Sequence, residues 1–538
     1  MYKQFIVYIV IAIILNTIIF PNFINFVLAE PSPKKIEEPF DTQFSSSTLQ
    51  NVNDDIVEIS GIFFITWVDP GINLENNNND NQDNRQEQQV YNLMDNSGKY
   101  YRLILSDDIK QQINGFGNLN AQQVVVTGTQ SEGNADLSST STPVITVQSI
   151  RPINDDINKS LNQNKSNDKD LDIQSHVPTS PGSTVFVEHV SGNQKFVTIL
   201  CRFGDSTNFT PEPISYAETL MDRLNDYYKD VSYNKINLDG SNVEGWYNMP
   251  DPRPNYFIQG IDNTKLLLDC ITAADNDIFF PDYDGINLLF NQNLFGVTSF
   301  GTNNLPIVMD GELKLYRVTF MSLFHWHNQD VLAHEMGHSF GLPHSSGQYD
   351  TSYDSNWDVM SATLACIYPD TEFRCHGPHT NSFYKYAIGW IDPSRTYNAN
   401  TGQDQIIFIE RLANPESFGY LTALIPIDGS NTEFYSIEAR KPIGYDNNEI
   451  PNPGILIHKI NTITTDLNTR VAQVVDTTID FNPNDAGATW TPGETFEDDT
   501  NNISIKVIKE TETGFWIVIN PSDSYLFLND LFDHIKEY

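Results

Sequence analysis

The chain has 538 residues, of which 70 are Asp or Glu and 31 are Lys or Arg, so its formal net charge is −39. Such an acidic surface repels phosphate backbones and anionic lipid, which argues against nucleic-acid binding. It favours cationic partners, including Ca²⁺, but no segment has the EF-hand spacing, so calcium has no further support. The length exceeds one hydrophobic core and indicates about three domains.

Residues 1–29 have the pattern of a secretory signal peptide. Lys3 precedes an apolar run over 5–20, and residues 27–29 (Val-Leu-Ala) provide a small-residue cleavage site. Asn16 interrupts the run, which therefore falls short of the ~20 apolar residues that span a bilayer. We predict a secreted protein with no membrane span after signal removal; an uncleaved signal that anchors the chain is the alternative.

A flexible leader (30–54) precedes a predicted small β domain over 55–152. Its strands are expected at 56–63, 100–105, 124–128 and 144–147. Short strands of this number suit an OB-like barrel, and the Asn-rich segment 73–89 is expected to be a disordered hairpin tip within it. OB barrels often bind nucleic acids or sugars, but the net charge favours a propeptide or accessory role.

Residues 153–180 are rich in Asn, Asp, Lys and Ser and have few large apolar groups, which indicates a disordered linker. A protease could cut there during activation. The linker separates the β domain from residues 181–397, where predicted strands and helices alternate. The strands are 195–201 and 285–291, and the helices are 216–228, 329–340 and 383–390. The alternation indicates an α/β sandwich with a mixed sheet, and the chain as a whole is expected to be α+β.

The helix predicted at 329–340 carries the most specific motif, H-E-x-x-H-x-x-G-x-x-H. His334 and His338 are four residues apart, so a helix stacks both imidazoles on one face, where they can share one zinc ion. Gly341 lets the chain leave the helix through a special backbone conformation, and the turn returns His344 as a third ligand. Three protein ligands leave a fourth position open, which is the catalytic form of a zinc site. Glu335 is then placed beside the metal's water.

Met360 follows His344 by sixteen residues, within the segment Trp-Asp-Val-Met-Ser. Alone it would be read as core filler, but metalloproteases with this motif pass a methionine turn beneath the zinc after the third histidine, and the resemblance to them implies that role for Met360. His325 and His327 precede the helix and are expected to be capping or surface groups rather than ligands. Asn328 is the expected N-cap, with Asp330 in the first turn; His376, His379 and His458 have no ligand spacing and are expected to be structural.

Four cysteines in a chain with a signal peptide suggest two disulfides. Cys366 and Cys375 are close in sequence and are paired first, which leaves Cys201 for Cys270; thiolate zinc ligands are the rival interpretation. Asn158, Asn164, Asn208 and Asn502 lie in glycosylation sequons.

Residues 398–521 have a strand pattern separated by turn residues, which indicates a β-sandwich-like domain. Its clearest strands are 434–439, 454–460, 503–507 and 515–519. Residues 522–538 form a tail, within which 524–538 is a plausible amphipathic helix.

Because Met360 follows the H-E-x-x-H-x-x-G-x-x-H motif, the chain resembles the metzincin metalloproteases. Within them it is most similar to the gametolysin (autolysin) family and also resembles immune-inhibitor-A-like proteases. The likeness covers roughly residues 180–520, with a weaker match over 55–150. The stretches that carry it besides the zinc motif are 232–235, 245–247, 282–287, 357–361, 388–391 and 491–494.

The resemblance implies a secreted zinc endopeptidase that cleaves extracellular, matrix or cell-wall proteins or glycoproteins, and we expect a monomer. A zinc-activated water would attack the peptide bond, with Glu335 as the general base. Some metzincins have a tyrosine two residues after the methionine, but here that position is Ala362. The alternatives are a catalytically silent binding or matrix protein, which the intact motif argues against, and a zinc hydrolase of non-peptide bonds.

Many metzincin precursors are silenced by a prosegment thiolate on the zinc. Residues 30–200 contain no cysteine. Inhibition by the N-terminal region must therefore be steric or use a carboxylate, such as that of an aspartate.

Overall fold

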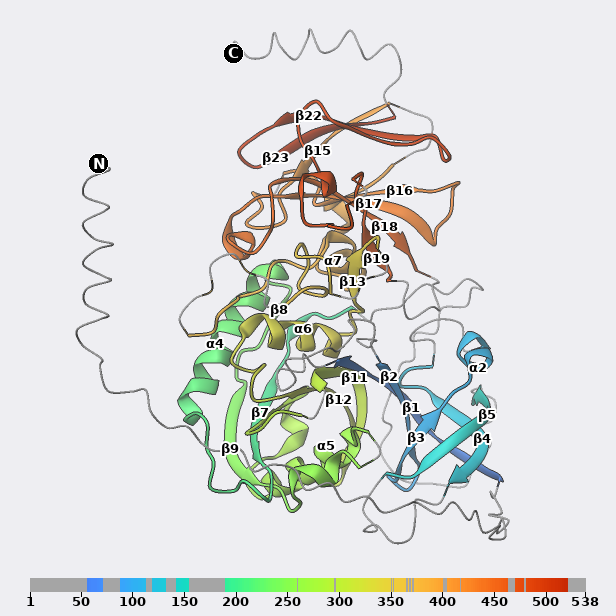
Figure 1. Cartoon of the computed structure of the whole chain (residues 1–538), viewed down its shortest axis with the longest axis vertical. Coiled ribbons are helices and arrows are strands. Elements are labelled where there is room, and N and C mark those ends of the chain that lie inside the picture. The colour runs from blue at the N-terminus through green and yellow to red at the C-terminus, as the bar shows by residue number, and fades with distance from the viewer. Residues whose placement is uncertain are drawn as a thin grey trace, which may run out of the picture. The chain divides into compact units, whose positions relative to one another are not determined.

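The structure is a computed structural model and is α+β, with more strands than helices (Figure 1). It describes residues 56–70, 88–112, 119–131, 142–153 and 189–520, apart from short gaps at 259, 295–296, 350, 352, 364–365, 367–368, 370–371, 400–403, 417, 463–469 and 479. The predicted signal peptide, leader and tail lie outside the described residues, as do most of the Asn-rich segment and all but the first residue of the linker. Among the described residues, no helix is long and apolar enough to cross a bilayer.

The N-terminal β module contains five strands, which pair in a closed cycle through the neighbours β1–β2, β2–β3, β3–β5, β5–β4 and β4–β1. The elements are β1 (Ile56–Pro70), β2 (Gln88–Asp95), β3 (Tyr100–Ile104), α2 (Asp107–Gln112), β4 (Gln123–Ser131) and β5 (Val144–Pro152).

The central region is built on a mixed sheet in the order β9-β7-β10-β12-β11. The first four strands are parallel, and β11 is antiparallel to β12. Helices α4 and α6 pack with one set of buried sheet side chains and α5 with another, so helices cover both faces. The elements are β7 (Phe196–Arg202), α4 (Ile214–Val231), β9 (Asn242–Asn248), α5 (Asn263–Ala274), β10 (Gly285–Phe290), β11 (Val297–Met309), β12 (Glu312–Met321) and α6 (Gln329–Ser339).

Strands β9, β11 and β12 were not predicted from the sequence. A signal for the last two was available, since Asp310 and Gly311 join them with φ values of 53° and 81°. An Asp-Gly pair with positive φ at both residues is a preferred two-residue hairpin connection.

Strand β1 belongs to two hydrophobic cores at once. Its side chains alternate across the strand, so that Phe63 and Ile65 pack inside the β module whereas Phe64 and Val68 join the core of the central sheet. β1 also pairs antiparallel with β11, which makes one ten-stranded sheet out of the two regions (Figure 1). The C-terminal part of β1 therefore lies along the edge of the central sheet.

The C-terminal region consists of two sheets that enclose a shared apolar core. One sheet contains β13, β14 and β16 to β20, and the other contains β15, β21, β22 and β23. The bounds are β13 (Ser345–Gly347), α7 (Ser382–Ala387), β14 (Thr396–Asn398), β15 (Gln405–Glu410), β16 (Thr422–Pro426), β17 (Glu433–Arg440), β18 (Gly454–Asn461), β19 (Ala472–Val474), β20 (Thr489–Trp490), β21 (Thr495–Asp498), β22 (Ile503–Glu510) and β23 (Gly514–Ile519).

Short elements complete the described residues: β6 (Gly192–Asn193), β8 (Ile236–Asn237), and the 3-10 turns η2 (Arg253–Tyr256), η3 (Phe280–Asp282), η4 (Pro393–Arg395), η5 (Gly444–Asp446) and η6 (Ala486–Ala488). The two predicted disulfides are confirmed. Cys201 pairs with Cys270 and Cys366 with Cys375, with Cα atoms 6.0 and 5.5 Å apart. The rival interpretation of the cysteines as thiolate ligands is therefore wrong.

Candidate metal centre

Helix α6 ends at the point where the sequence requires a turn. Gly341 has a φ of +96°, in the left-handed region that favours glycine. Its N–H donates to the His338 carbonyl at 2.8 Å, and the Leu342 N–H donates to the Gly337 carbonyl at 3.0 Å. These two bonds form a Schellman closure of the helix. The closure reverses the chain within three residues and brings His344 back beside the helix.

The start of α6 differs from the expectation. Asn328 is at the N-cap position, but its side chain makes no capping bond and its amide nitrogen donates to the Phe324 carbonyl instead. The first helical N–H groups of Gln329 and Asp330 donate to the carbonyls of Phe373 and Cys375. The segment that contains Phe373 and Cys375, which is closed by the Cys366–Cys375 disulfide, therefore caps the start of α6 in place of the asparagine side chain.

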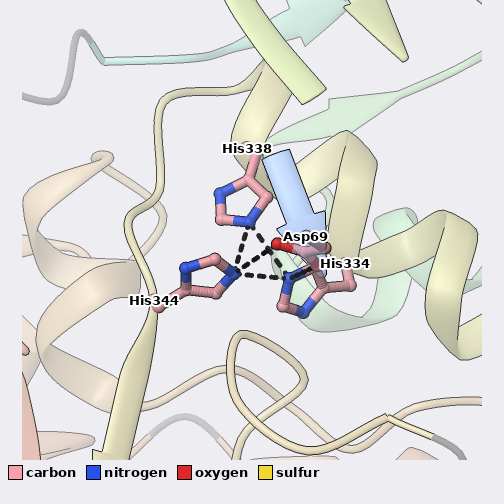
Figure 2. Close-up of side chains that lie close together, drawn as sticks. All are labelled: Asp69, His334, His338 and His344. Atoms are coloured by element: carbon pink, nitrogen blue, oxygen red, sulfur yellow. Dashed lines mark hydrogen bonds and ion pairs between the residues drawn. The ribbon is translucent and has the colours of Figure 1, made fainter. Parts of the chain in front are cut away.

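The three motif histidines converge on one point (Figure 2). The Nε2 atoms of His334, His338 and His344 lie 3.0, 3.0 and 2.9 Å from one another. All three side chains are buried. A tetrahedral zinc ion with bonds of about 2.0–2.1 Å holds its ligand nitrogens about 3.3 Å apart, so the triangle matches a metal to within a few tenths of an ångström.

Backbone carbonyls fix the orientation of two of these rings. The Nδ1 of His334 is 2.6 Å from the Val359 carbonyl oxygen, and the Nδ1 of His338 is 2.7 Å from that of Leu342. A carbonyl can only accept, so each Nδ1 donates, and in the neutral ring Nε2 keeps its lone pair for a metal. Burial, together with the neighbouring histidines His344 and His334, lowers the pKa of His338 well below its usual value, which favours this neutral form.

The methionine turn predicted from sequence lies directly against α6. Met360 is buried, and its sulfur lies so close to Gly337 that a Cβ at position 337 would collide with it. Asp358 holds the turn, because one carboxylate oxygen accepts from the Met360 N–H at 2.8 Å and the other accepts from the Ser345 hydroxyl at 2.8 Å. The same oxygen accepts from the Asn381 amide at 2.6 Å, so Asp358 links the turn to the strand after His344 and to the start of α7. Sequence reasoning did not single out Asp358.

A fourth residue, Asp69, enters the cluster from the far end of β1 (Figure 2). Its Oδ2 is 3.2 Å from the His334 Nε2, and its Oδ1 is 3.2 Å from the His344 Nε2. Burial acts to raise the pKa of Asp69, but the imidazoles of His344 and His334 outweigh it and hold this pKa well below its usual value. Asp69 and the three histidines thus form a buried group that could hold a metal ion.

Two aromatic side chains surround Asp69. The Tyr353 hydroxyl donates to Asp69 Oδ1 at 2.9 Å, from a loop residue with a φ of +58°. The Trp67 ring stacks on the His338 imidazole, with ring centres 5.7 Å apart and planes 8° from parallel. No motif in the sequence marks Asp69, Trp67 or Tyr353, because the first two lie on another strand far upstream of the zinc motif.

Glu335 is fully buried next to the cluster, and neither of its carboxylate oxygens has a hydrogen-bond partner within the described part of the chain. Burial, and then the nearby Asp69 carboxylate, raise the pKa of Glu335 well above its usual value. A buried carboxylate without a donor is unfavourable unless a bound group satisfies it. The donor set of three imidazoles and a carboxylate, together with this glutamate, fits a metal and a water beside it.

The remaining histidines stay outside the centre. His327 is half-buried, and its Nε2 lies 3.4 Å from Glu212; His325 is buried beside Ser322, so the expectation of a surface group is wrong for His325. His379 and His458 are buried in other clusters, and His376 contacts Arg223. None of them joins a metal-compatible group among the described residues. A second group of possible ligands contains Cys366, Cys375 and Glu449, but its two cysteines form a disulfide and therefore offer no thiolate.

Comparison with known proteins adds no independent assignment: no protein-family model matches the sequence, and no curated protein matches it. The argument for function therefore depends on the chemistry of the site itself.

Proposed function

We propose that the protein is a secreted zinc-dependent endopeptidase. The observation that carries this proposal is the convergence of three histidine Nε2 atoms within 3.0 Å of one another beside a buried glutamate, Glu335, without a hydrogen-bond donor. Neither feature is expected of a purely structural cluster, since buried polar groups are normally paired.

Zinc is the proposed metal because its protein sites are built from imidazole nitrogen and carboxylate oxygen, and a His₃ set is the form found in catalytic sites. When bound, it would supply Lewis acidity and lower the pKa of a coordinated water to about 7. His334, His338 and His344 would be its ligands. The carbonyl partners of His334 and His338 would keep both rings aimed at it.

Glu335 is the proposed general base. It directly follows the first ligand on α6, and burial keeps its carboxylate away from bulk water. It would accept the proton of the attacking water and then donate it to the leaving amine. Burial raises the pKa of this carboxyl above its usual value, which favours uptake of the proton that it must later donate.

A metzincin arrangement, and within it the likeness to gametolysin, is part of the proposal. Three features support it. The zinc motif closes α6 with a glycine turn, the methionine turn packs against Gly337, and the central sheet ends in one antiparallel strand, β11, next to the helix. The matrix or cell-wall substrate class comes from the resemblance alone.

Secretion is supported by the signal-peptide pattern and by two disulfides, since such bonds persist in oxidising compartments. Asn208 and Asn502, the two sequon asparagines among the described residues, are exposed and so accessible to a glycosylating enzyme. The acidic chain remains an expected monomer without a nucleic-acid partner.

The test uses the full chain on a mixed peptide library, before and after brief trypsin treatment that is stopped with a serine-protease inhibitor. We expect new peptide cleavage that a zinc chelator abolishes and that added zinc restores. Glu335→Gln, treated in the same way, is the control for contaminating proteases. Cleavage that resists the chelator, or that is equal in Glu335→Gln, would refute the proposal and favour the silent binding protein.

A further inference from the structure

We propose that strand β1 is a built-in inhibitor of the metal centre: Asp69 takes the fourth metal position, and the segment around it covers the edge of the central sheet, so that the site opens only when β1 leaves. This inference rests on the proposed function. It adds a regulatory role for the N-terminal β module, for which the sequence left both an inhibitory and an accessory role open.

The position of the Asp69 carboxylate is the first support. Its two oxygens each lie 3.2 Å from a different ligand nitrogen, those of His334 and His344. A zinc ion takes a carboxylate oxygen at about 2.0–2.2 Å, so one Asp69 oxygen can complete a tetrahedron with the three imidazoles. The Tyr353 hydroxyl holds the Oδ1 in place. Four protein ligands make a closed site, which is the structural and not the catalytic form of a zinc centre.

Glu335 is the second support. In a closed site no water can bind the metal, and a general base beside it has nothing to deprotonate. Yet Glu335 is buried, has no hydrogen-bond donor among the described residues, and lies near a second carboxylate, that of Asp69. Keeping two carboxylates together in a buried site is costly. The arrangement has a chemical purpose only if Asp69 can be replaced by a water.

The course of β1 is the third support. Thr66, Trp67 and Val68 pair with Thr302, Gly301 and Phe300 of β11 in an antiparallel ladder that leads directly to Asp69. An extended peptide that binds a sheet edge would need the same backbone groups of β11. Trp67 also covers the imidazole of His338 by stacking on it. β1 therefore blocks both the metal and the strand edge at which an extended substrate could be held.

The covalent connections of the chain allow the N-terminal β module to separate from the central sheet. Both disulfides lie C-terminal to the β module, and no free cysteine is present among the described residues. After a chain break between Ile153 and His189, only non-covalent contacts would hold the module. These include a hydrogen bond from Asn263 to Thr66 and one from the Tyr100 hydroxyl to the Pro306 carbonyl. After such a break, no disulfide would prevent β1 from leaving.

The experiment compares the full chain with Asp69→Asn, which keeps the size of the side chain but loses its charge, and with Asp69→Ala. Asp108→Asn is the matched control, because Asp108 is exposed in the same module. Each protein is loaded with Co²⁺, and its visible absorption spectrum, which reports the ligands of the metal, is recorded before and after trypsin treatment. Peptide hydrolysis by the zinc forms is measured in parallel, and thermal unfolding verifies that each variant is folded.

We expect the cobalt spectra of Asp69→Asn and Asp69→Ala to differ from that of the uncut wild type and to match that of the cut wild type. A site that is open about 1 % of the time shows about 1 % of its activity, so cutting the wild type should raise peptide hydrolysis by roughly 100-fold. Uncut Asp69→Asn, in which β1 still covers β11, should hydrolyse peptides no faster than uncut wild type. Asp108→Asn should behave as wild type in both measurements.

Two results would overturn the proposal. An identical cobalt spectrum in wild type and both Asp69 variants means that Asp69 is not a ligand. A spectrum that changes in the variants but not on cutting means that Asp69 is a permanent ligand. If the spectra change as expected but no form cleaves peptides, Asp69 is a displaceable metal ligand and the proposed peptidase function is wrong. The spectra thus separate the two proposals.

Discussion

Two buried clusters of histidine and carboxylate groups lie close together in this chain, and they differ in how their charges are balanced. In the cluster around α7, the guanidinium of Arg440 contacts Glu438 at 3.0 Å and Asp446 at 2.7 Å. Nearby, Lys385 donates to the Val231 carbonyl at 2.8 Å and contacts the ring of His379 at 2.5 Å. The protein supplies the cations of this cluster.

The metal centre is built differently. The groups it brings together are three imidazoles and the two carboxylates of Asp69 and Glu335. The Nε2 atoms of the three rings lie about 3 Å from one another, an arrangement that a shared metal ion would stabilise. Both clusters are buried and both contain histidine, so neither feature by itself indicates a functional site. The distinguishing feature of the candidate metal centre is the convergence of four possible ligand atoms on one point.

The largest effect is expected from His338→Ala. Removing one of three imidazoles should strip the metal and reduce peptide hydrolysis to background, because an incomplete ligand set cannot hold zinc. Elemental analysis and the peptide assay check this. The matched control is His458→Gln, since His458 is equally buried in a different cluster and should leave the metal content unchanged. Full zinc occupancy in His338→Ala would place the metal elsewhere.

Glu335→Ala separates the base from the ligands. The variant should keep its zinc but lose hydrolysis by about 10²–10⁴-fold, the usual contribution of general-base catalysis. The measurement is kcat/KM on the best library peptide after activation, together with zinc content. Near-normal turnover would remove Glu335 from the mechanism without affecting the metal assignment.

Arg440→Met tests the second cluster. Removing the guanidinium leaves Glu438 and Asp446 buried and uncompensated, which should lower the free energy of unfolding by about 3–5 kcal/mol. Denaturant unfolding measures the loss. Lys441→Met is the control, because its ion pair with the half-exposed Glu510 should contribute only about 0–1 kcal/mol. The folded fraction of Arg440→Met should still bind zinc, and loss of the metal site would show that the clusters are not independent.

The smallest effect is a pH dependence of stability. Burial lowers the pKa of Lys385 to about 7, against about 10.4 in an unfolded chain. Between these values the unfolded chain binds one more proton than the folded one, so stability rises with pH, by up to about 1.4 kcal/mol per unit. Unfolding of wild type and Lys385→Met from pH 7 to 9 checks this, and Lys385→Met should show a shallower rise. An unchanged slope would mean that Lys385 stays protonated within the fold.

The sequence alone predicted that the three motif histidines converge, because their geometry is local. His334 and His338 are one helical turn apart, and Gly341 and His344 belong to the turn that closes the same helix, so eleven consecutive residues determine how the rings converge. The strands and helices with clear periodicity were predicted for the same reason. Both disulfides were also predicted, because Cys366 and Cys375 are close in sequence and leave Cys201 for Cys270.

Contacts between distant segments could be decided only by the tertiary structure. Asp69 is one aspartate among many and follows a strand with no ligand spacing to the zinc motif; only the pairing of β1 with β11 carries it to the metal centre. Asp358 and Tyr353 likewise lie in loops that only the tertiary structure brings back against α6. Side-chain period and capping rules act over a few residues, whereas the pairing of two sheet edges depends on the packing of both cores, which is not encoded in any short segment.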